Sequence, residues 1–448
     1  MHSRIITKNR KRMKEKVLML ILLITTAVGH VTAVEKDSES NKEPSKIENV
    51  MSRLTIGGYG EAVYSYNMYS DKYMRYLSPE RYKDETHGRF DLPHVVIFLG
   101  YDFGKGWTMG SEIEFEHGGT ESAMEIEEEE AGEYESEIER GGEVALEQFW
   151  IQKSFMPQLN VRIGHIIVPV GGTNMHHMPT EFFGVYRPEG ENTIMPCTWH
   201  ETGISIWGRA GDWRYEALLV PGLDSDRFGR MGWIHDGAGS PYEFKIGNAV
   251  AGAFRVDNFS VPGLRLSVSG YVGNSFSNTL SANRNSTRYK DVKGTVMIGA
   301  FDFNYTGHNW IVRGNFDYGH LSDAETITKV NINNMSQDSP SPHQAVASAA
   351  IAGGIEAGYN IFAHIGKLAD KGQKFYVFGR YDYYDSMHET DTDIYNFCGR
   401  SRVAAGINYY PLKDIVIKGE YSIGLLESPY NNEPAISVGI AYSGFFTR

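Results

Sequence analysis

The sequence is poor in cysteine, in long apolar runs and in positive charge. Its two cysteines, Cys197 and Cys398, are too few for a disulfide scaffold, and their spacing leaves open whether they pair. Beyond the N-terminal region, apolar stretches such as 95–99 and 345–352 fall short of the ~20 residues that a membrane helix needs. Lys and Arg number 43 against 56 Asp and Glu. This balance disfavours nucleic acid or an anionic lipid surface as a partner.

The N-terminal region has the composition of an export signal. Basic residues between Lys8 and Lys16 precede the apolar run Val17–Val28, and Val31-Thr32-Ala33 supplies small residues for cleavage. We therefore expect residues 1–33 to be a cleaved signal peptide; an uncleaved anchor is the alternative, which the short apolar run disfavours. Residues 34–53 are polar and predict a flexible periplasmic segment before one domain at 54–448.

From Leu54 onward the apolar residues alternate with polar ones. In one example Leu264, Leu266 and Val268 oppose Arg265 and Ser267. A period of two puts these sets on opposite faces of a strand. Sixteen such runs predict an all-β fold, at 54–66, 89–103, 107–117, 144–155, 160–168, 201–210, 212–220, 247–258, 264–273, 294–305, 309–319, 351–363, 374–385, 401–410, 414–424 and 435–446.

The gaps between these runs are alternately long and short, and aromatic residues such as Trp107, Trp213 and Trp310 flank the short ones. Short periplasmic turns, long outer loops and aromatic girdles are typical of a transmembrane antiparallel β-barrel in the outer membrane of a Gram-negative bacterium. A barrel of about 16 strands leaves an aqueous lumen. We therefore expect a channel for passive diffusion of ions and small polar solutes. A surface receptor or adhesin that conducts little is the alternative.

Catalytic patterns such as Gly-x-Ser-x-Gly and the phosphate loop are absent from the sequence, so we expect neither an enzyme nor a cofactor. The alternation instead assigns charges of both signs to the lumen, which predicts weak ion selectivity with cations favoured or neither. The assigned lumen charges are Arg162, Arg209, Arg255, Arg265, Arg313, Arg380, Arg402, Lys418, Glu112, Glu114, Asp382 and Glu420.

Residues 148–172 read QFWIQKSFMPQLNVRIGHIIVPVGG. This segment resembles the porin O and P family of phosphate-selective porins, whose Arg-x-Gly…Pro-x-Gly pattern matches Arg162, Gly164, Pro169 and Gly171. The resemblance implies a homotrimer in which a long loop, here 169–200, folds into the pore after this strand. The family's phosphate selectivity rests on lysines and arginines at the pore. Between Gly171 and His200 this sequence offers only Arg187, so the preference for phosphate stays open.

The segment 169–200 is predicted to constrict the pore, with Pro179, Pro188 and Pro196 stiffening its backbone. The alternative is an outward loop that covers the barrel or contacts neighbouring subunits. Met175-His176-His177-Met178, with Cys197 and His200, has ligand types that suit copper or zinc but no recognisable spacing, so we expect polar pore lining and no metal. The residues assigned to the constriction are His176, His177, Glu181, Arg187, Glu189 and Glu191.

Residues 121–139 contain ten glutamates. Such a run is typical of a solvated, self-repelling outer loop. The alternative is a segment that collects divalent cations near the channel mouth.

Overall fold

The computed structural model describes residues 50–118, 143–240, 242–333, 345–391 and 397–447. The predicted signal peptide at 1–33, most of the segment 34–53 and the glutamate run at 121–139 lie outside these ranges, so they stay predictions. Among the described residues, no helix has the length and apolar character needed to cross a bilayer.

The described chain is a sheet that closes on itself. Apart from β2 and β3, which both pair with β1, each strand pairs antiparallel with the next, and the ring is completed where β1 pairs with β17, as in Tyr59 opposite Ser443. Closure leaves no open edge of unpaired backbone groups. The strands are β1 Leu54–Asn67, β2 His87–Asp91, β3 His94–Gly104, β4 Trp107–Glu116, β5 Val144–Met156, β6 Leu159–Ile167, β7 His200–Ala210, β8 Trp213–Pro221, β9 Val250–Asn258, β10 Leu264–Asn274, β11 Thr295–Gly307, β12 Trp310–Leu321, β13 Ala349–Asn360, β14 Lys374–Glu389, β15 Gly399–Leu412, β16 Ile415–Leu425 and β17 Ala435–Phe445.

The prediction of sixteen antiparallel strands in a barrel is confirmed, with one interruption. The strands β2 and β3 lie end to end along β1, and together they form the predicted strand 89–103. The break falls at Leu92 and Pro93. Proline has no N–H to donate to a neighbouring strand, which accounts for the break in the ladder at this point.

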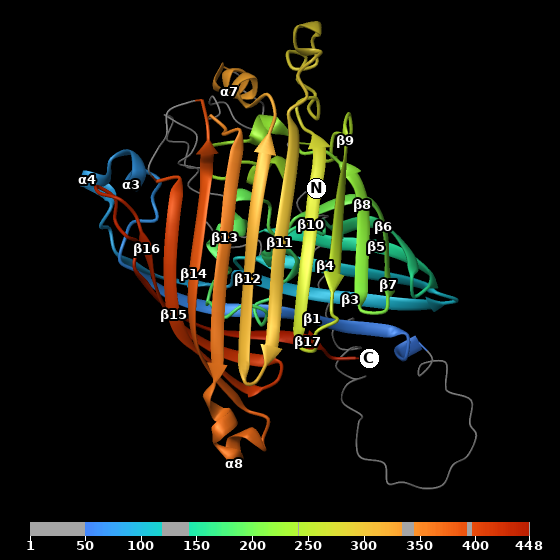
Figure 1. Cartoon of the computed structure of the whole chain (residues 1–448), viewed down its shortest axis with the longest axis vertical. Coiled ribbons are helices and arrows are strands. Elements are labelled where there is room, and N and C mark those ends of the chain that lie inside the picture. Colours follow the sequence, from blue (N-terminus) through green and yellow to red (C-terminus); the bar gives the residue numbers. More distant parts are fainter. Residues whose placement is uncertain (1–49, 119–142, 241, 334–344, 392–396, 448) are drawn as a thin grey trace, which may run out of the picture. The chain divides into compact units, whose positions relative to one another are not determined.

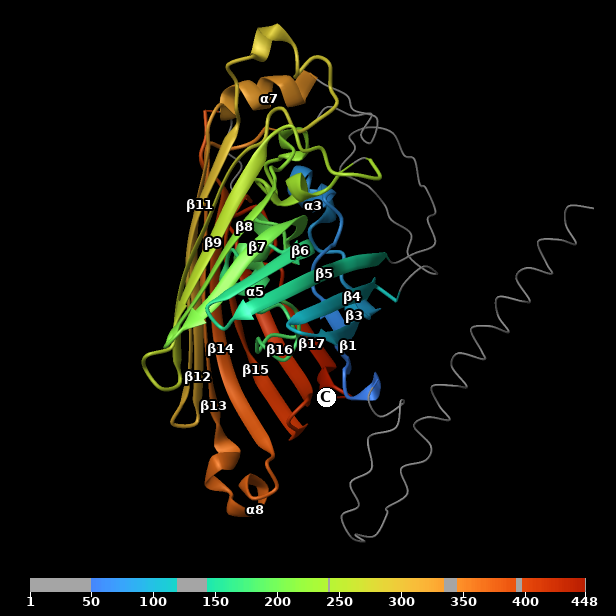
Figure 2. The same ribbon diagram turned by 90° about the vertical axis from the view of Figure 1, so that its right-hand side faces the viewer.

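Long connections lie at one end of the barrel and short ones at the other, as the alternating gap lengths predicted. Figures 1 and 2 show α7 (Ala324–Asn333) at the long-loop end and α8 (Gly366–Ala369) at the opposite end. The hairpin 361–373, which contains α8 and η4 (Ile361–His364), is the longest connection at the short-turn end. The other short helices are α3 Met74–Leu77, α4 Pro79–Tyr82, α5 Gly172–Met175, α6 Glu189–Ile194, η1 Ser225–Arg227, η2 His235–Ala238 and η3 Thr287–Tyr289, all in long connections.

The outer and inner faces of the wall differ in chemistry. Outward positions such as Ile204, Ile206, Val268, Val272 and Ile440 are apolar and about half exposed. Inward positions on β8, β9 and β11–β13 are apolar toward the long loops and charged toward the short turns. On β9, for example, Ala251 and Ala253 come first and Arg255 and Asp257 follow.

The core lies inside the barrel at the long-loop end, where the apolar inward positions are. Buried side chains of the long loops pack there, among them Trp199, Phe228, Trp233, Phe276 and Ile327. The structure thus differs from a plain water-filled lumen. Apolar groups supplied by the loops remove the apolar inner-wall positions from water, so this part of the interior is packed like a soluble protein.

Candidate functional site

Ion pairs link the charged side chains on the inner face of neighbouring strands. Arg214 of β8 lies 2.5 Å from Glu216 and 3.1 Å from Asp257 of β9. Arg255 lies 2.7 Å from Asp257 and 2.9 Å from Asp302 of β11. Both groups of the Arg255–Asp302 pair are almost fully buried. Buried charges of this kind persist because each has a partner of opposite sign.

The same pattern continues along the wall from β12 to β16. Arg313 lies 2.6 Å from Glu356, and Arg380 lies 2.8 Å from Asp382 and 3.7 Å from Glu420. The strand register puts every predicted lumen charge on the inner face, with Arg209 exposed near a short turn. Positively and negatively charged side chains therefore alternate at spacings of a few ångströms along this wall.

The segment 168–199 between β6 and β7 enters the barrel and is tied to the far wall. The backbone N–H of Gly171 donates to Ser269 Oγ of β10 at 3.1 Å, and Arg255 donates to the Gly171 carbonyl at 3.0 Å. Within the segment, Glu191 of α6 accepts hydrogen bonds from the backbone N–H groups of Gly172 and Asn174, at 2.7 and 2.8 Å. These bonds hold α5 against α6.

Residues 182–185 form a strap against β13, β14 and β16. Lys418 of β16 donates to the carbonyls of Phe182 and Gly184, at 3.1 and 2.6 Å. The N–H groups of Phe183 and Val185 donate to the carboxylates of Glu356 and Glu420, both at 3.1 Å. A Cβ on Gly184 would lie 2.0 Å from Arg380 and 2.7 Å from a backbone oxygen, so only glycine fits. Buried wall charges thus bind the backbone of this segment across the lumen.

The structure brings together only some of the predicted constriction residues. His176 contacts Arg265 of β10 and lies 3.1 Å from Glu181, whereas Glu189 pairs with Arg402 of β15 at 2.8 Å. Burial alone would raise the pKa of Glu181, but the hydrogen bond and charge of His176 lower it. Glu181 is therefore an anion hydrogen-bonded to His176.

Of the remaining three constriction residues, His177 and Glu191 are buried and Arg187 is half-buried. Arg187 donates to the carbonyls of His177 and Cys197, at 3.3 and 3.5 Å, and does not pair with Glu189 or Glu191. Burial and then the charge of Arg187 lower the pKa of His177 to about 4, so this imidazole is neutral at pH 7. Burial raises the pKa of Glu191 to about 7. These side chains stabilise the folded segment rather than lining an open passage.

The four residues of the family pattern have structural roles around the entry of this segment. Arg162 stacks on Trp150, with its guanidinium 4.7 Å from the ring centre. Gly164 has φ +141, and a Cβ there would lie 2.1 Å from the Phe149 carbonyl oxygen. Gly171 has φ +84, and a Cβ there would lie 2.2 Å from Glu191. Both glycines are required by close packing. Pro169 is part of the buried run that follows β6.

A small pocket of about 60 Å³, open on one side, lies between the segment and the wall. Its lining includes His176, Glu181 and Phe182 from the segment, and Arg265, Arg313 and Asp382 from the wall. The lining carries both signs of charge and suits small polar solutes or hydrated ions more than apolar ligands.

The wall formed by β1 and β3–β5 lies opposite β11–β13 and has a different charge pattern (Figures 1 and 2). Its inner face carries Glu61, Glu112, Glu114, Glu116 and Glu147. Glu61 and Glu147 are both buried. The Tyr59 hydroxyl donates to Glu147 at 3.3 Å, and Gln148 donates to Glu112. In these two hydrogen bonds the partners of Glu112 and Glu147 are thus neutral side chains, not arginines.

A β-bulge explains why Glu147 was missed as a lumen residue. The register between β4 and β5 shifts between Glu112 and Ile113, so that Glu147 and Gln148 both face inward while Leu146 and Phe149 face outward. The extra residue of a bulge re-aims side chains in this way. The signal in the sequence was a slip in the alternation after Leu146.

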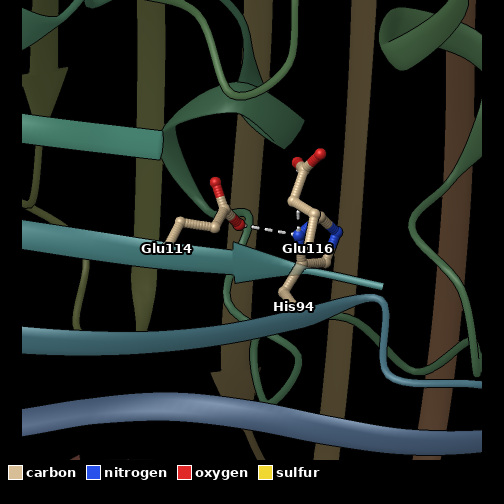
Figure 3. A group of neighbouring side chains, drawn as sticks. All are labelled: His94, Glu114 and Glu116. Atoms are coloured by element: carbon tan, nitrogen blue, oxygen red, sulfur yellow. Dashed lines mark hydrogen bonds and ion pairs between the residues drawn. The ribbon is translucent and has the colours of Figure 1, made fainter. Parts of the chain in front are cut away.

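One group of side chains in the described part of the chain has metal-ligand geometry. Potential ligand atoms of His94, Glu114 and Glu116 all lie within 4.8 Å of one another (Figure 3). They come from the paired strands β3 and β4, where His94 is directly opposite Glu116. The loop histidines weighed from the sequence do not gather: His176 contacts Arg265 and Glu181, and His177 contacts the Asn174 carbonyl.

Comparisons with known proteins agree on the architecture. No protein-family profile matches this sequence. An uncharacterized protein of Aquifex aeolicus is 28% identical over 396 residues, covering 84% of this chain and 77% of that protein.

Two solved structures have a similar fold. OmpF of Salmonella typhi, in complex with daunomycin, covers 88% of this chain and 99% of its own, with 12% identity and a TM-score of 0.52. An anion-selective porin from Comamonas acidovorans covers 87% and 99%, with 10% identity and a TM-score of 0.50. The chain therefore has the fold of the general bacterial outer-membrane porins.

Proposed function

We propose that this chain is an outer-membrane porin that lets ions and small polar solutes diffuse through a narrowed passage. One observation carries the proposal: a closed barrel is apolar outside and charged inside, and the segment 168–199 is hydrogen-bonded across its interior. An apolar outer face suits lipid, and a charged inner face suits water and ions. Passage follows from that arrangement and needs neither a catalytic group nor a cofactor.

We also propose where the protein resides and how it assembles. Residues 1–33 are an export signal, the mature chain resides in the outer membrane of a Gram-negative bacterium, and three copies assemble as a homotrimer. The porin-like fold supports this placement, and the trimer is taken from the resemblance to the porin O and P family.

The solute preference is proposed from charge. Acids on β1, β4 and β5 outnumber the cations facing them, whereas most charges on β8–β16 are in ion pairs; Asp317, hydrogen-bonded to Asn315, is an exception. Unpaired acids along a passage raise the local cation concentration. We therefore propose a weak cation preference and no selectivity for phosphate. The pattern Arg162, Gly164, Pro169 and Gly171 is accounted for by packing at the entry of the segment.

Planar-bilayer recording of the refolded chain tests this function. The wild type should form discrete channels of low conductance, because loops fill part of the mouth. Replacing residues 176–195 by a short Gly-Ser linker should raise single-channel conductance severalfold, since that segment crosses the interior.

Two results would count against the proposal. A folded wild type that does not conduct would favour the receptor or adhesin alternative, for which the packed mouth is the supporting observation. A linker variant that inserts normally but conducts like the parent would show that 176–195 is not the constriction. Heat-modifiable migration on gels, with Arg209→Gln at an exposed inner position as a control, reports that the barrel has folded.

A further inference from the structure

We propose that His94, Glu114 and Glu116 bind one divalent first-row transition-metal ion on the inner face of the β3–β4 hairpin, at its long-loop end. One imidazole and two carboxylates form a mixed donor set that suits Zn²⁺ and its neighbours, whereas Ca²⁺ and Mg²⁺ prefer oxygen donors alone. Figure 3 shows the carboxylate of Glu114 directed toward the ring of His94, with the side chain of Glu116 next to the ring.

The distances suit a small ion. His94 Nδ1 lies 2.7 Å from Glu114 Oε1 and 3.9 Å from Glu116 Oε1. Ligand atoms around tetrahedral zinc, each about 2.0–2.2 Å from the metal, lie about 3.3–3.6 Å apart. The two measured distances bracket that separation, so small side-chain rotations bring all three donors into range.

The hairpin fixes the donors. His94 and Glu116 are paired residues of adjacent strands, and Glu114 lies two residues along the same face. Side chains on paired strands have little freedom to separate, which is the preorganisation that metal sites need. Glu116 is 34% exposed, whereas His94 is 16% and Glu114 is 6% exposed. The site therefore has an open side through which water or a solute can complete the coordination.

Charge around the site supplies a second, independent reason for a cation. Glu112 and Glu147 lie on the same inner wall, and Glu147 is completely buried. Among the described residues, Arg187 is the fixed positive charge that acts on both Glu114 and Glu147. A single histidine can neutralise only one carboxylate, and uncompensated buried carboxylates are costly. A bound divalent ion offsets that cost.

An ordinary histidine–glutamate ion pair is the competing interpretation, and metal titration separates the two. Full-length mature protein, folded in detergent, should bind one Zn²⁺ per chain by isothermal titration calorimetry. His94→Ala and Glu114→Gln should each weaken binding at least about tenfold. Ca²⁺ at the same concentration should not displace the zinc.

Two control variants make the experiment specific. His117→Ala removes an exposed imidazole on the adjacent residue of the same strand end, which is paired with Asp91 at 2.7 Å, and should leave zinc binding unchanged. Deleting residues 121–139 removes ten glutamates that follow β4 in the sequence, and should also leave the tight site in place. Gel migration reports whether each variant has folded.

The proposal is overturned if the wild type binds no zinc, if His94→Ala binds as tightly as the parent, or if deleting 121–139 abolishes binding. These outcomes do not depend on conduction, so the porin proposal and the metal proposal fail separately. If both hold, micromolar Zn²⁺ should reduce the wild-type current and leave that of Glu114→Gln unchanged.

Discussion

Two sides of the same barrel are built differently. From β8 to β14 the inner wall is apolar near the long loops, and its charges near the short turns are paired, as in Arg255 with Asp302. From β1 to β5 the inner wall carries carboxylates whose partners are a tyrosine, a glutamine and a histidine. The first side is stabilised by packing and ion pairs, whereas the second has excess negative charge. We infer that stability depends mainly on the first side and ion preference on the second.

The largest effect is expected where a buried charge binds the strap. Lys418→Met removes the donor to the carbonyls of Phe182 and Gly184 and leaves Glu420 without that neighbouring charge. Breaking a buried charge network costs about 3–5 kcal/mol, and urea unfolding in detergent should show a loss of that size. Lys413→Met is the matched control, because Lys413 is 83% exposed and its pair with Asp414 is worth about 0–1 kcal/mol. Equal losses would contradict the role of Lys418 in holding the strap.

A second effect depends on pH. Glu433, between β16 and β17, accepts from Arg75 at 3.0 Å and Tyr76 at 2.6 Å, and lies 3.3 Å from Arg400. Burial alone would raise the pKa of Glu433, but the charges of Arg400 and then Arg75 lower it below its usual range.

A lowered folded-state pKa stabilises the protein above the unfolded pKa, near 4.5, and this stabilisation is lost as pH falls through the folded-state pKa. Glu433→Gln should therefore destabilise the barrel by about 3 kcal/mol at pH 7, and by progressively less in acid. Unfolding curves between pH 7 and pH 3 measure this. Exposed Glu325→Gln, which breaks only a solvent-exposed pair with Lys329, should change stability far less at every pH, and a gap for Glu433→Gln that widens in acid would exclude the assigned role.

A smaller effect should appear on the acidic side in ion preference. Glu112→Gln should lower the cation-to-anion permeability ratio by roughly a factor of two, because it removes one of several like charges. Reversal potentials in a salt gradient measure the ratio. Glu112→Asp retains the charge and should behave like the parent. On the other side, replacing Arg214 and Glu216 of β8 together removes an ion pair away from the strap and should leave the ratio unchanged. If the pair removal shifts it as much as Glu112→Gln, the contrast between the walls does not govern selectivity.

The smallest effect concerns the two thiols. Burial raises the pKa of Cys197 to about 12 and that of Cys398 to about 11, and both are free. Thiolate is the reactive form, so neither should react appreciably with a disulfide reagent at pH 8 until the barrel is unfolded. Reductant should leave the melting temperature unchanged. A thiol count below two after unfolding would instead reveal a disulfide.

The strand pattern was sufficient to predict the barrel, but it predicted the side chains of the interior only in part. Alternation predicted sixteen strands and both faces, because every strand must be apolar on one side. It failed at Pro93, which interrupts one strand, and at Glu147, where a bulge adds a residue. These are local departures from the period of two. The composition of the segment 169–200 indicated a loop with many contacts, but the burial of His177 and Glu191 depends on strands far away in the sequence.

The His94, Glu114 and Glu116 group shows a different limit. The two glutamates were recognised as inward charges, whereas His94 was not considered. Its position opposite Glu116 depends on the register of β3 against β4, which alternation alone does not fix. Candidate ligands on separate strands become recognisable only once the pairing is known.

The packing of long-loop side chains inside one end of the barrel limits where the protein tolerates inserted peptides. In most barrels the outer loops are the most replaceable part, since they contribute little to the fold. Here Trp233, in the connection 222–249, packs on Gly319 and donates to the Ala347 carbonyl at 3.1 Å. An epitope tag or grafted peptide in this connection would disturb the core, whereas one in the 361–373 hairpin, with its exposed Gly366–Ala369 helix, would not. The safest place to engineer this barrel is therefore the end opposite its long loops.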